Sequence, residues 1–224
     1  MFLTRFHVDA RTPAGARALD DAQHMHAMVA RATAVPSQSD GSPGRTLWRL
    51  DRDDPAAPIL WVVSAARPDL DAFAAEAGRV VAGVVYSSRP YETLLDRLVV
   101  GQVYAFRLAA NAARSGRRTP ESSSTQRFGH VTAAQQLSWL QDRAAAHGFA
   151  LRSLAGGEPD AAVVGRRRLT FFRQGRRVTI ALSDFMGHLE VSEPDTLRRS
   201  LVFGIGHGRA YGAGLLTLAQ PRSR

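Results

Sequence analysis

The distribution of apolar residues predicts that the chain begins with a strand followed by a helix. Residues 1–8 (MFLTRFHV) alternate between apolar and polar with a period of two, as a strand does when one face is buried. Residues 21–33 instead have apolar side chains three and four positions apart, the spacing of one face of a helix. These side chains are Met25, Met28, Val29 and Ala32. Pro13 breaks the pattern between the two segments, and Asp20 or Asp21 can cap the helix.

Further segments complete a first unit of mixed composition. Strands are expected at 46–51, 59–65 and 101–110, a helix or irregular segment at 69–78, and a loop at 36–45. The order is then β-α-β-β-α-β, which is the order of a ferredoxin-like unit. We therefore expect an N-terminal ferredoxin-like domain over residues 1–111, carrying the helix of residues 21–33.

The same order of elements starts again after a linker at 112–126, which is rich in Ser and Arg. The second unit is expected to contain a short strand at 127–131, a helix at 132–147, strands at 149–154, 166–173, 176–184 and 187–193, a helix from Asp195 to Phe203, and a last strand at 212–219. The predicted fold class is α+β, with two tandem ferredoxin-like (RRM-like) βαββαβ domains. The second domain is expected over residues 127–221.

The net charge narrows the choice of partners. The 224 residues include 29 basic and 20 acidic side chains, a formal net charge of +9, and every basic residue is Arg. A GC-rich genome would explain the use of Arg in place of Lys, but it would not explain the net charge. Nucleic acid and anionic membranes are the usual partners of such a surface. Because the sequence contains no basic amphipathic helix, nucleic acid is favoured and a membrane partner is not expected.

The composition also excludes several classes of chemistry. The chain has no Cys, which excludes disulfides, thiolate metal sites and Cys nucleophiles. No apolar run approaches the ~20 residues that span a bilayer. The N-terminal segment is too short and too polar for a secretory signal. We expect a soluble, cytoplasmic protein without a cofactor.

A glycine-rich segment between a predicted helix and a predicted strand is the most distinctive motif. It covers residues 204–218 (GIGHGRAYGAGLLTL). Its glycines are Gly204, Gly206, Gly208, Gly212 and Gly214. Glycine permits positive φ and close backbone approach, so the N–H groups of such a loop can face phosphates. Neither a Walker loop nor a dinucleotide-binding fingerprint fits its sequence and position. A flexible surface loop is the alternative interpretation.

A second basic feature is predicted at residues 166–177 (RRRLTFFRQGRR). Two strands flank Gln174-Gly175, which suit a hairpin turn. The arginines expected to face outward are Arg166, Arg168, Arg173, Arg176 and Arg177. Such a ribbon suits phosphates along an RNA stem. The alternative is a charged edge hairpin that prevents aggregation.

Several stretches resemble one known family. The segment GIGHGRAYGAGLLTLA resembles the glycine-rich loop of the CasE family, the CRISPR repeat-processing endoribonucleases of type I-E systems, with Arg209 at the basic position of that loop. Similar stretches occur in the same order along the whole chain. These are MFLTRFHVD, HMHAMVARA, YAFRLAANAARSGR and QQLSWLQDRAAAHGFAL.

This resemblance implies a reaction and partners. The family cuts a hairpin in CRISPR repeat RNA without a metal: a 2′-hydroxyl attacks the adjacent phosphate, the 5′-oxygen leaves, and a 2′,3′-cyclic phosphate results. The resemblance also implies that the protein stays bound to the mature RNA, together with other Cas subunits of a surveillance complex. The arginines of residues 166–177 and the glycine-rich segment with Arg209 are then expected to bind RNA.

The resemblance places the catalytic residues on the helix of residues 21–33. His26 matches the catalytic His, Gln23 stands where many members have Tyr, and Arg31 matches a basic position. A His suits proton transfer near neutral pH, whereas an amide does not ionise. On a helix His24 and His26 point about 200° apart, so they cannot share a metal ion. The alternative for His26 is an ordinary surface histidine without a catalytic role. The alternative for Arg31 is a solvated charge near the end of the helix, where it interacts favourably with the helix dipole.

Three hypotheses remain open at this stage. The first is the endoribonuclease, and the second is a non-catalytic RNA-binding subunit of the same fold, in which His26 is incidental. The third is a DNA-binding module, although no helix-turn-helix or zinc motif is present. A cleavage assay on a repeat-hairpin RNA in EDTA separates the first hypothesis from the other two.

Overall fold

The structure is a computed structural model that describes residues 1–33, 46–117, 125–173 and 175–221. The loop expected at 36–45 lies outside the described residues, as does Gln174 of the expected hairpin turn. None of the described helices combines the length and apolar character needed to cross a bilayer.

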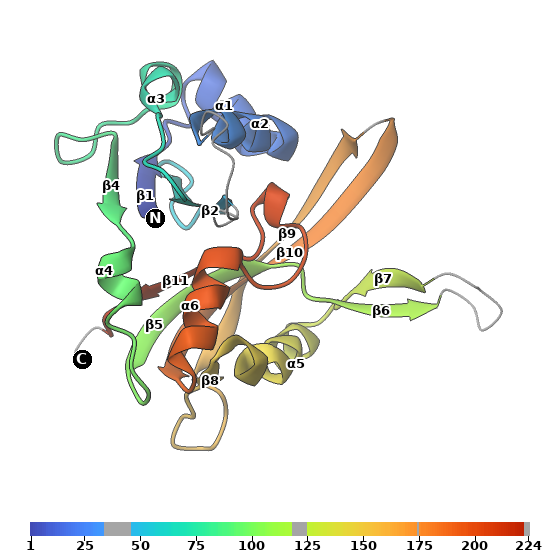
Figure 1. Ribbon diagram of the computed structural model, residues 1–224. Coiled ribbons are helices and arrows are strands. Elements are labelled where there is room, and N and C mark those ends of the chain that lie inside the picture. The colour runs from blue at the N-terminus through green and yellow to red at the C-terminus, as the bar shows by residue number, and fades with distance from the viewer. Residues whose placement is uncertain (34–45, 118–124, 174, 222–224) are drawn as a thin grey trace, which may run out of the picture.

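The first sheet contains four strands in the order β2-β3-β1-β4. The strands are β1 (Phe2–His7), β2 (Leu47–Asp51), β3 (Ile59–Ser64) and β4 (Tyr86–Pro90). The helices of this unit are α1 (Pro13–Asp20), α2 (Ala22–Ala32) and α3 (Asp71–Ala77), which lie together over the sheet (Figure 1). Their apolar faces and the sheet enclose one hydrophobic core. The predicted first strand and the predicted helix of residues 21–33 are confirmed.

Helix α1 was not expected, because Pro13 was interpreted as a break. Pro13 instead opens the helix, where the missing N–H of proline costs nothing. The Thr12 hydroxyl caps α1 by accepting a hydrogen bond from the Gly15 N–H at 3.0 Å. The same capping principle starts α2, where the Asp21 carboxylate accepts from the N–H groups of Gln23 and His24. Of the two capping residues expected for α2, Asp21 is therefore the correct one.

The second sheet has the order β11-β5-β10-β8. Its strands are β5 (Val103–Ala110), β8 (Phe149–Leu151), β10 (Arg176–Val191) and β11 (Leu216–Ala219). Its helices α5 (Ala133–Ala144) and α6 (Pro194–Phe203) lie on one face of it, and the short helix α4 (Glu92–Leu95) precedes β5 (Figure 1). Both sheets follow the strand order of a ferredoxin-like unit, so the predicted fold class is confirmed.

The position of β5 corrects the prediction for the first unit. We expected the strand at 101–110 to close the first sheet, but β5 pairs with β10 and β11 of the second sheet. Strand β4 closes the first sheet in its place, pairing with β1. A boundary between the two units that precedes β5 fits this strand pairing better than the predicted boundary after residue 111.

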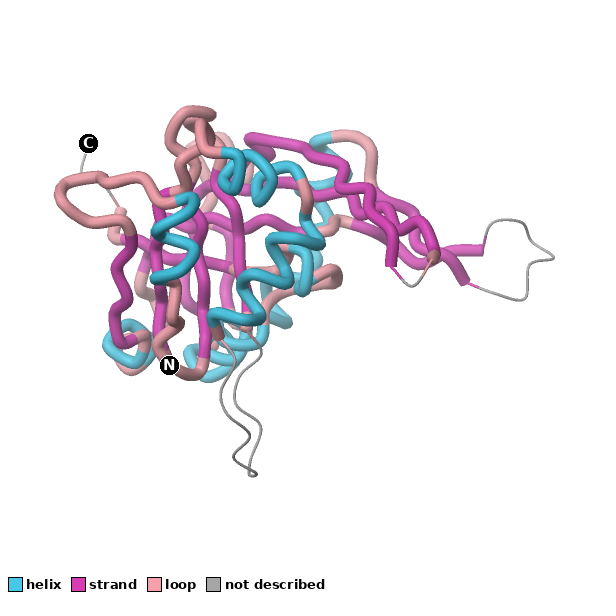
Figure 2. Tube along the Cα trace, turned by 90° about the horizontal axis from the view of Figure 1, so that it is seen from above, coloured by secondary structure: helices cyan, strands magenta, loops and turns pink. Residues whose placement is uncertain are grey.

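Two strand pairs extend from the same side of the molecule (Figure 1, Figure 2). One is the hairpin of β9 (Ala161–Arg173) with the long strand β10, into which the strands expected at 176–184 and 187–193 merge. The other pairs β6 (Ala113–Arg117) with β7 (Thr125–Gly129), where we expected a linker and, from 127, a short strand. Because β7 pairs with β6, it is not part of the second sheet.

Strand β2 contributes to the cores of both units, and all five of its residues are buried. Leu47 belongs to the core of the second unit, whereas Trp48 belongs to the core of the first. Arg49 is only 1% exposed and forms a paired ion contact with Asp51, at 2.7 and 3.0 Å. Its third nitrogen donates to the carbonyl oxygens of Arg107 at 2.9 Å and Leu215 at 3.0 Å. One guanidinium of the first sheet thus holds two segments of the second.

Arg107 extends this ionic cluster towards the surface. Its Nε lies 3.2 Å from the Asp51 carboxylate, and its guanidinium also donates to Asp53 at 2.8 Å. The hydrogen bond from Arg107 lowers the pKa of the Asp53 carboxyl below its usual value. The buried charge of Asp51 is therefore balanced by two arginines, one from each sheet.

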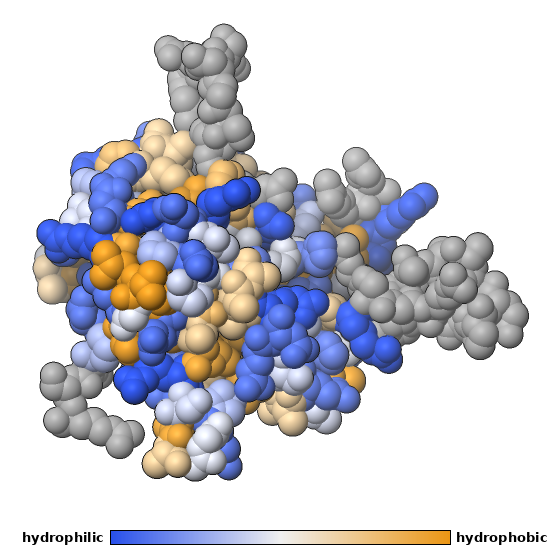
Figure 3. All heavy atoms as spheres, turned by 60° about the horizontal axis from the view of Figure 1, so that its bottom comes forward, coloured by the Kyte–Doolittle hydropathy of each residue, from blue (hydrophilic) through white to orange (hydrophobic). Residues whose placement is uncertain are grey.

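The face of the molecule that lies at the bottom of Figure 1 is mostly hydrophilic. Figure 3 brings the bottom of the molecule forward and shows hydrophobic side chains only in small, separate areas. Exposed apolar residues include Val99, Val100 and Leu154. Scattered apolar residues of this kind are normal on a globular surface, so this face does not indicate an apolar interface.

Replacing Arg49 should weaken the whole structure. Arg49→Ala removes the charge that neutralises buried Asp51 and frees two buried carbonyls, so the free energy of unfolding should fall by about 3–5 kcal/mol. Urea unfolding followed by circular dichroism measures this loss. Arg89→Ala, at an exposed position of β4, is the charge-matched control. A loss below about 1 kcal/mol in Arg49→Ala would show that the contact is not needed for stability.

Candidate active site

The glycine-rich segment packs between the two units. It runs from the end of α6 to β11 and contacts β2 and α2 through a 3₁₀ turn at Arg209–Tyr211. The Trp48 indole N–H donates to the carbonyl oxygen of Ala210 at 3.0 Å. A Cβ at Gly212 would lie 2.7 Å from the Trp48 ring. The indole of β2 therefore holds the segment in place, and only glycine fits beneath it.

The five glycines of this segment fall into two groups. All five have φ between 78° and 88°, which favours glycine. Gly204, Gly212 and Gly214 are buried, so their role is to allow close packing. Gly206 and Gly208 are partly exposed, and an added Cβ at either would meet nothing closer than 3.5 Å. Only these two remain candidates for backbone contact with a bound phosphate.

Arg209 supports the segment from within. Its Nε donates to the carbonyl oxygen of Gly206 at 2.9 Å and its Nη1 to that of Phe203, at the end of α6, at 2.8 Å. These bonds satisfy a carbonyl that the helix end leaves open. Part of its guanidinium is therefore used by the fold, although the side chain still lines the hollow described next.

His26 lies at a hollow that joins both units. The hollow has a volume of about 650 Å³. It is lined by His26, Val29, Ala30 and Thr33 of α2, Thr46 and Trp48 at β2, and Gly208, Arg209, Ala210 and Tyr211 of the glycine-rich segment. Among the residues that the structure describes, none forms a hydrogen bond with the His26 imidazole. Both ring nitrogens can therefore serve a ligand in this hollow.

Tyr211 is the residue that sequence reasoning missed. Its ring centroid lies 5.5 Å from that of His26 at an angle of 57°, and 4.1 Å from that of Phe171 on β9. The imidazole is thus supported by the glycine-rich segment, which is in turn supported by the hairpin. The only sequence signal was an aromatic residue within a run of glycines.

The other catalytic candidates lie outside this lining. Gln23 and Arg31 are exposed on α2 at either side of His26 along the helix, and neither lines the hollow. His24 lies on the same helix, two positions from His26, so the two imidazoles point in different directions. The described part of the chain contains no group of three or more His, Asp or Glu residues placed to hold a metal ion.

Two further histidines, His147 and His188, have structural surroundings. Burial, with the charges of Arg143 and Arg209, lowers the pKa of His147, whose Nδ1 lies 2.9 Å from the Ser200 hydroxyl. His188 pairs with Asp160 at 2.8 Å. These contacts indicate a structural role for both.

The strand register divides the hairpin arginines between two faces. Arg166 and Arg168 of β9 share a face with Arg177 of β10, since paired residues point to the same side. Arg176, whose backbone pairs with that of Arg173, belongs by register to the opposite face, with Leu169 and Phe171. The arginines that we expected to face outward therefore do not all share one face of the hairpin.

Arg167 takes the inner position that alternation gives it. Its guanidinium contacts the buried carboxylate of Asp184 at 3.0 Å. Together with Leu169 and Tyr211 it lines the narrow space between the hairpin and the first unit. This face of the hairpin is consequently the one directed towards α2 and His26.

Comparisons with known proteins cover nearly the whole chain. The family model described as "CRISPR associated protein" matches residues 1–220. The CRISPR-associated endoribonuclease Cse3 of Thermus thermophilus is 28% identical over 231 residues, covering 98% of this chain and 100% of that protein.

Solved structures agree with this similarity. A structure of the CRISPR endoribonuclease Cse3 bound to a 19-nucleotide RNA matches with a TM-score of 0.80 and 27% identity, covering 98% of this chain and 100% of the other. A chain of a CRISPR RNA-guided surveillance complex in a pre-nicking state shares the fold, with a TM-score of 0.67, 24% identity and coverage of 99% and 100%.

Two glycines with the same backbone conformation should respond differently to alanine. Gly206 and Gly212 have φ of 79° and 81°, so alanine at either should cost about 1–2 kcal/mol of unfolding free energy. At Gly212 the new Cβ also collides with Trp48, which should add about 1–3 kcal/mol. Thermal or urea unfolding of the two variants checks this difference. Equal losses would mean that the Trp48 contact does not restrict this position.

Proposed function

Because the chain belongs to the family of CRISPR-associated proteins, and within it to the CasE-type, Cas6-like proteins, we propose that it is an endoribonuclease that cuts CRISPR precursor RNA within the repeat hairpin. The observation that carries the proposal is the position of His26, at a hollow of about 650 Å³ between α2 and the glycine-rich segment. The similarity to an endoribonuclease bound to RNA extends over both units.

The proposed reaction uses the RNA as its own nucleophile. The 2′-hydroxyl loses its proton and its oxygen forms a bond to the adjacent phosphorus, while the bond from phosphorus to the 5′-oxygen breaks. The leaving 5′-oxygen takes up a proton, so the products are a 2′,3′-cyclic phosphate and a 5′-hydroxyl. Since no water has to be activated as the nucleophile, we propose that the step needs no metal ion.

His26 is proposed to transfer the proton in this reaction. An imidazole at the surface of the hollow can give or accept a proton near neutral pH. Tyr211 holds the ring in place through its tilted contact. Gln23 can only form hydrogen bonds, so a second ionising partner on that face of α2 is absent from the proposed scheme.

Arginines are proposed to stabilise the negative charge that grows on the phosphate. Arg31 is exposed in the last turn of α2, and its guanidinium suits a phosphate oxygen when RNA wraps the end of that helix. The backbone at Gly208 and the Arg209 guanidinium would contact the RNA from the other side of the hollow, and the partly exposed backbone at Gly206 would contact it outside the hollow.

The β9–β10 hairpin is proposed to bind the RNA stem. Arg176 belongs by register to the face directed towards His26, which suits a phosphate of a duplex whose end lies in the hollow. Such contacts would also keep the cut RNA bound. We propose that the protein retains this product as part of a surveillance complex with other Cas subunits, as the fold shared with a chain of such a complex suggests.

A cleavage assay tests the proposed chemistry. The protein is expected to cut a CRISPR repeat-hairpin RNA in EDTA, and a 2′-deoxy substitution at the nucleotide 5′ of the cut should block the reaction because it removes the nucleophile. A denaturing gel and analysis of the termini measure both. If EDTA stops cleavage and Mg²⁺ restores it, the mechanism is wrong. A folded protein that binds this RNA without cutting it would instead be the non-catalytic subunit.

The two histidines of α2 provide a matched pair. His26→Ala should reduce the cleavage rate by ~10²–10⁴-fold with little change in RNA affinity, because one proton-transfer group is lost. His24→Ala, two positions away on the same helix, should cut nearly as the parent does. Single-turnover rates and filter binding measure the two quantities, and circular dichroism controls for folding. A dead His24→Ala beside an active His26→Ala would place the active site on the other side of α2.

A further inference from the structure

The second face of the β9–β10 hairpin carries its own set of RNA-binding side chains. We name it the outer face, because the inner face is directed towards α2 and Tyr211. By register it carries Arg166, Arg168, Thr170 and Phe172 of β9 and Arg177, Thr179 and Ala181 of β10. A two-stranded ribbon separates it from the hollow at His26, so a molecule bound there is distinct from one in the active site.

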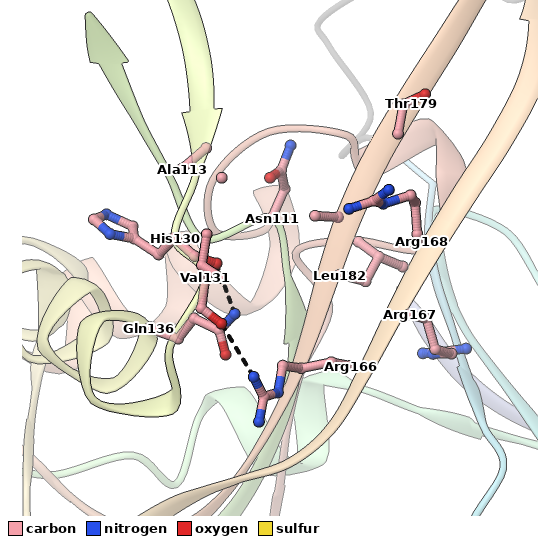
Figure 4. A pocket seen from close by; sticks show the side chains of 12 residues that line it. Asn111, Ala113, His130, Val131, Gln136, Arg166, Arg167, Arg168, Thr179 and Leu182 are labelled. Atoms are coloured by element: carbon pink, nitrogen blue, oxygen red, sulfur yellow. Dashed lines mark hydrogen bonds between the residues drawn. The ribbon is translucent and has the colours of Figure 1, made fainter.

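A groove runs along this outer face. It has a volume of about 540 Å³ and lies between the hairpin and the base of the β6–β7 pair (Figure 4). Ala113, Gly129 and His130 line one side, and Arg166 and Arg168 line the other. The volume is within the ~300–1,000 Å³ of small-ligand sites, which suits one or two nucleotides and is too small for a duplex.

Arginines on this face are available to an anion. Among the described residues, Arg168 and Arg177 form no hydrogen bond or ion pair. Arg166 donates to the carbonyl oxygen of Val131 at 3.0 Å, which holds it at the edge of the groove (Figure 4). The outer face thus presents two guanidinium groups that the fold does not use, beside one that it positions.

A buried amide in the groove lacks one partner. Gln136 is only 4% exposed, and its Nε2 donates to the His130 carbonyl oxygen at 2.8 Å. Its Oε1 accepts no hydrogen bond from the described residues. A buried amide oxygen without a donor is costly, and an N–H or O–H group of a ligand in the groove would satisfy it.

An exposed aromatic ring completes the set. Phe172 is 70% exposed on the outer face, and its pairing partner on β10 is Arg177. An exposed ring beside unpaired arginines is the arrangement that binds unstacked bases, because any base can stack on the ring while its phosphate meets a guanidinium.

We propose that the outer face binds the single-stranded RNA that flanks the repeat hairpin. Arg168 and Arg177 would contact phosphates, Phe172 would stack with a base, and the Gln136 amide oxygen would accept from a base N–H or a 2′-hydroxyl. An acidic protein segment could meet the arginines but has no planar base for Phe172, so RNA explains more of the face. The inference rests on the proposed function, because binding of the RNA stem on the inner face would place the single-stranded flank near the outer face.

The test compares RNAs with and without a flank. Labelled repeat hairpins are prepared bare or with a single-stranded extension of about ten nucleotides at the 5′ or 3′ end. Each carries a 2′-deoxy nucleotide at the cut, so that it is bound but not cleaved. Fluorescence anisotropy measures their affinity for the parent protein, Phe172→Ala and Arg168→Ala. Arg199→Ala, an exposed arginine of α6, is the charge-matched control. The substituted side chains are at the surface, and circular dichroism confirms folding.

The parent should bind one flanked RNA more tightly than the bare hairpin. Phe172→Ala should lower the affinity for that RNA by about 5- to 150-fold, as expected for one stacked base, and leave the bare hairpin unaffected. Arg168→Ala should reduce the slope of log affinity against log salt by about 0.7 for the flanked RNA only. Arg199→Ala should bind both RNAs as the parent does.

Each other outcome overturns the inference. Equal losses for flanked and bare RNA would assign the outer face to the stem. If the parent protein binds neither extended RNA more tightly than the bare hairpin, the outer face instead binds a protein partner or serves only to keep the protein soluble. Both results keep the proposed function intact, because the bare hairpin is still bound and cut, whereas a parent that neither binds nor cuts it disproves the proposed function itself.

Discussion

The burial of Arg49 is the constraint on which the site depends. A guanidinium that is 1% exposed has lost its hydration, so it is stable only with a complete set of acceptors. Asp51 supplies two, and the carbonyls of Arg107 and Leu215 supply the rest from the second unit. Since Leu215 belongs to the glycine-rich segment, the same contact sets how that segment meets β2. The hollow at His26 is therefore a consequence of how the two sheets are joined.

A chain of contacts leads from this joint to His26. Trp48 directly precedes Arg49 on β2, so its side chain points to the other side of the strand. There its ring lies over Gly212, and its indole N–H donates to the carbonyl oxygen of Ala210. These contacts hold the 3₁₀ turn so that Tyr211 packs against His26. The catalytic candidate is thus carried by the first unit and contacted by a residue of the second.

Local sequence patterns predicted the elements well and their partners poorly. Alternation located β1, other apolar patterns located β2 and β3, and helical spacing located α2 and α5, because these patterns are set by neighbouring residues. Pro13 was misinterpreted because a proline ends a helix in one context and opens it in another. Strand β4 (Tyr86–Pro90) was missed because it is a short edge strand without a buried apolar face. The strand at 101–110 was placed in the wrong sheet because the sequence of one strand does not specify which strand it pairs with.

By itself the sequence determined the α+β class, the two ferredoxin-like units, the family resemblance, the helix that carries His26, and the clusters of arginine and glycine. These depend on composition, on short-range periodicity and on motifs that can be identified without knowing which residues are in contact. Only the tertiary structure decided that Tyr211 supports His26, that Gly212 lies beneath Trp48, and that the hairpin arginines occupy two faces. Those facts depend on register and on packing between segments far apart in the chain, where shifting a strand by one residue exchanges its two faces.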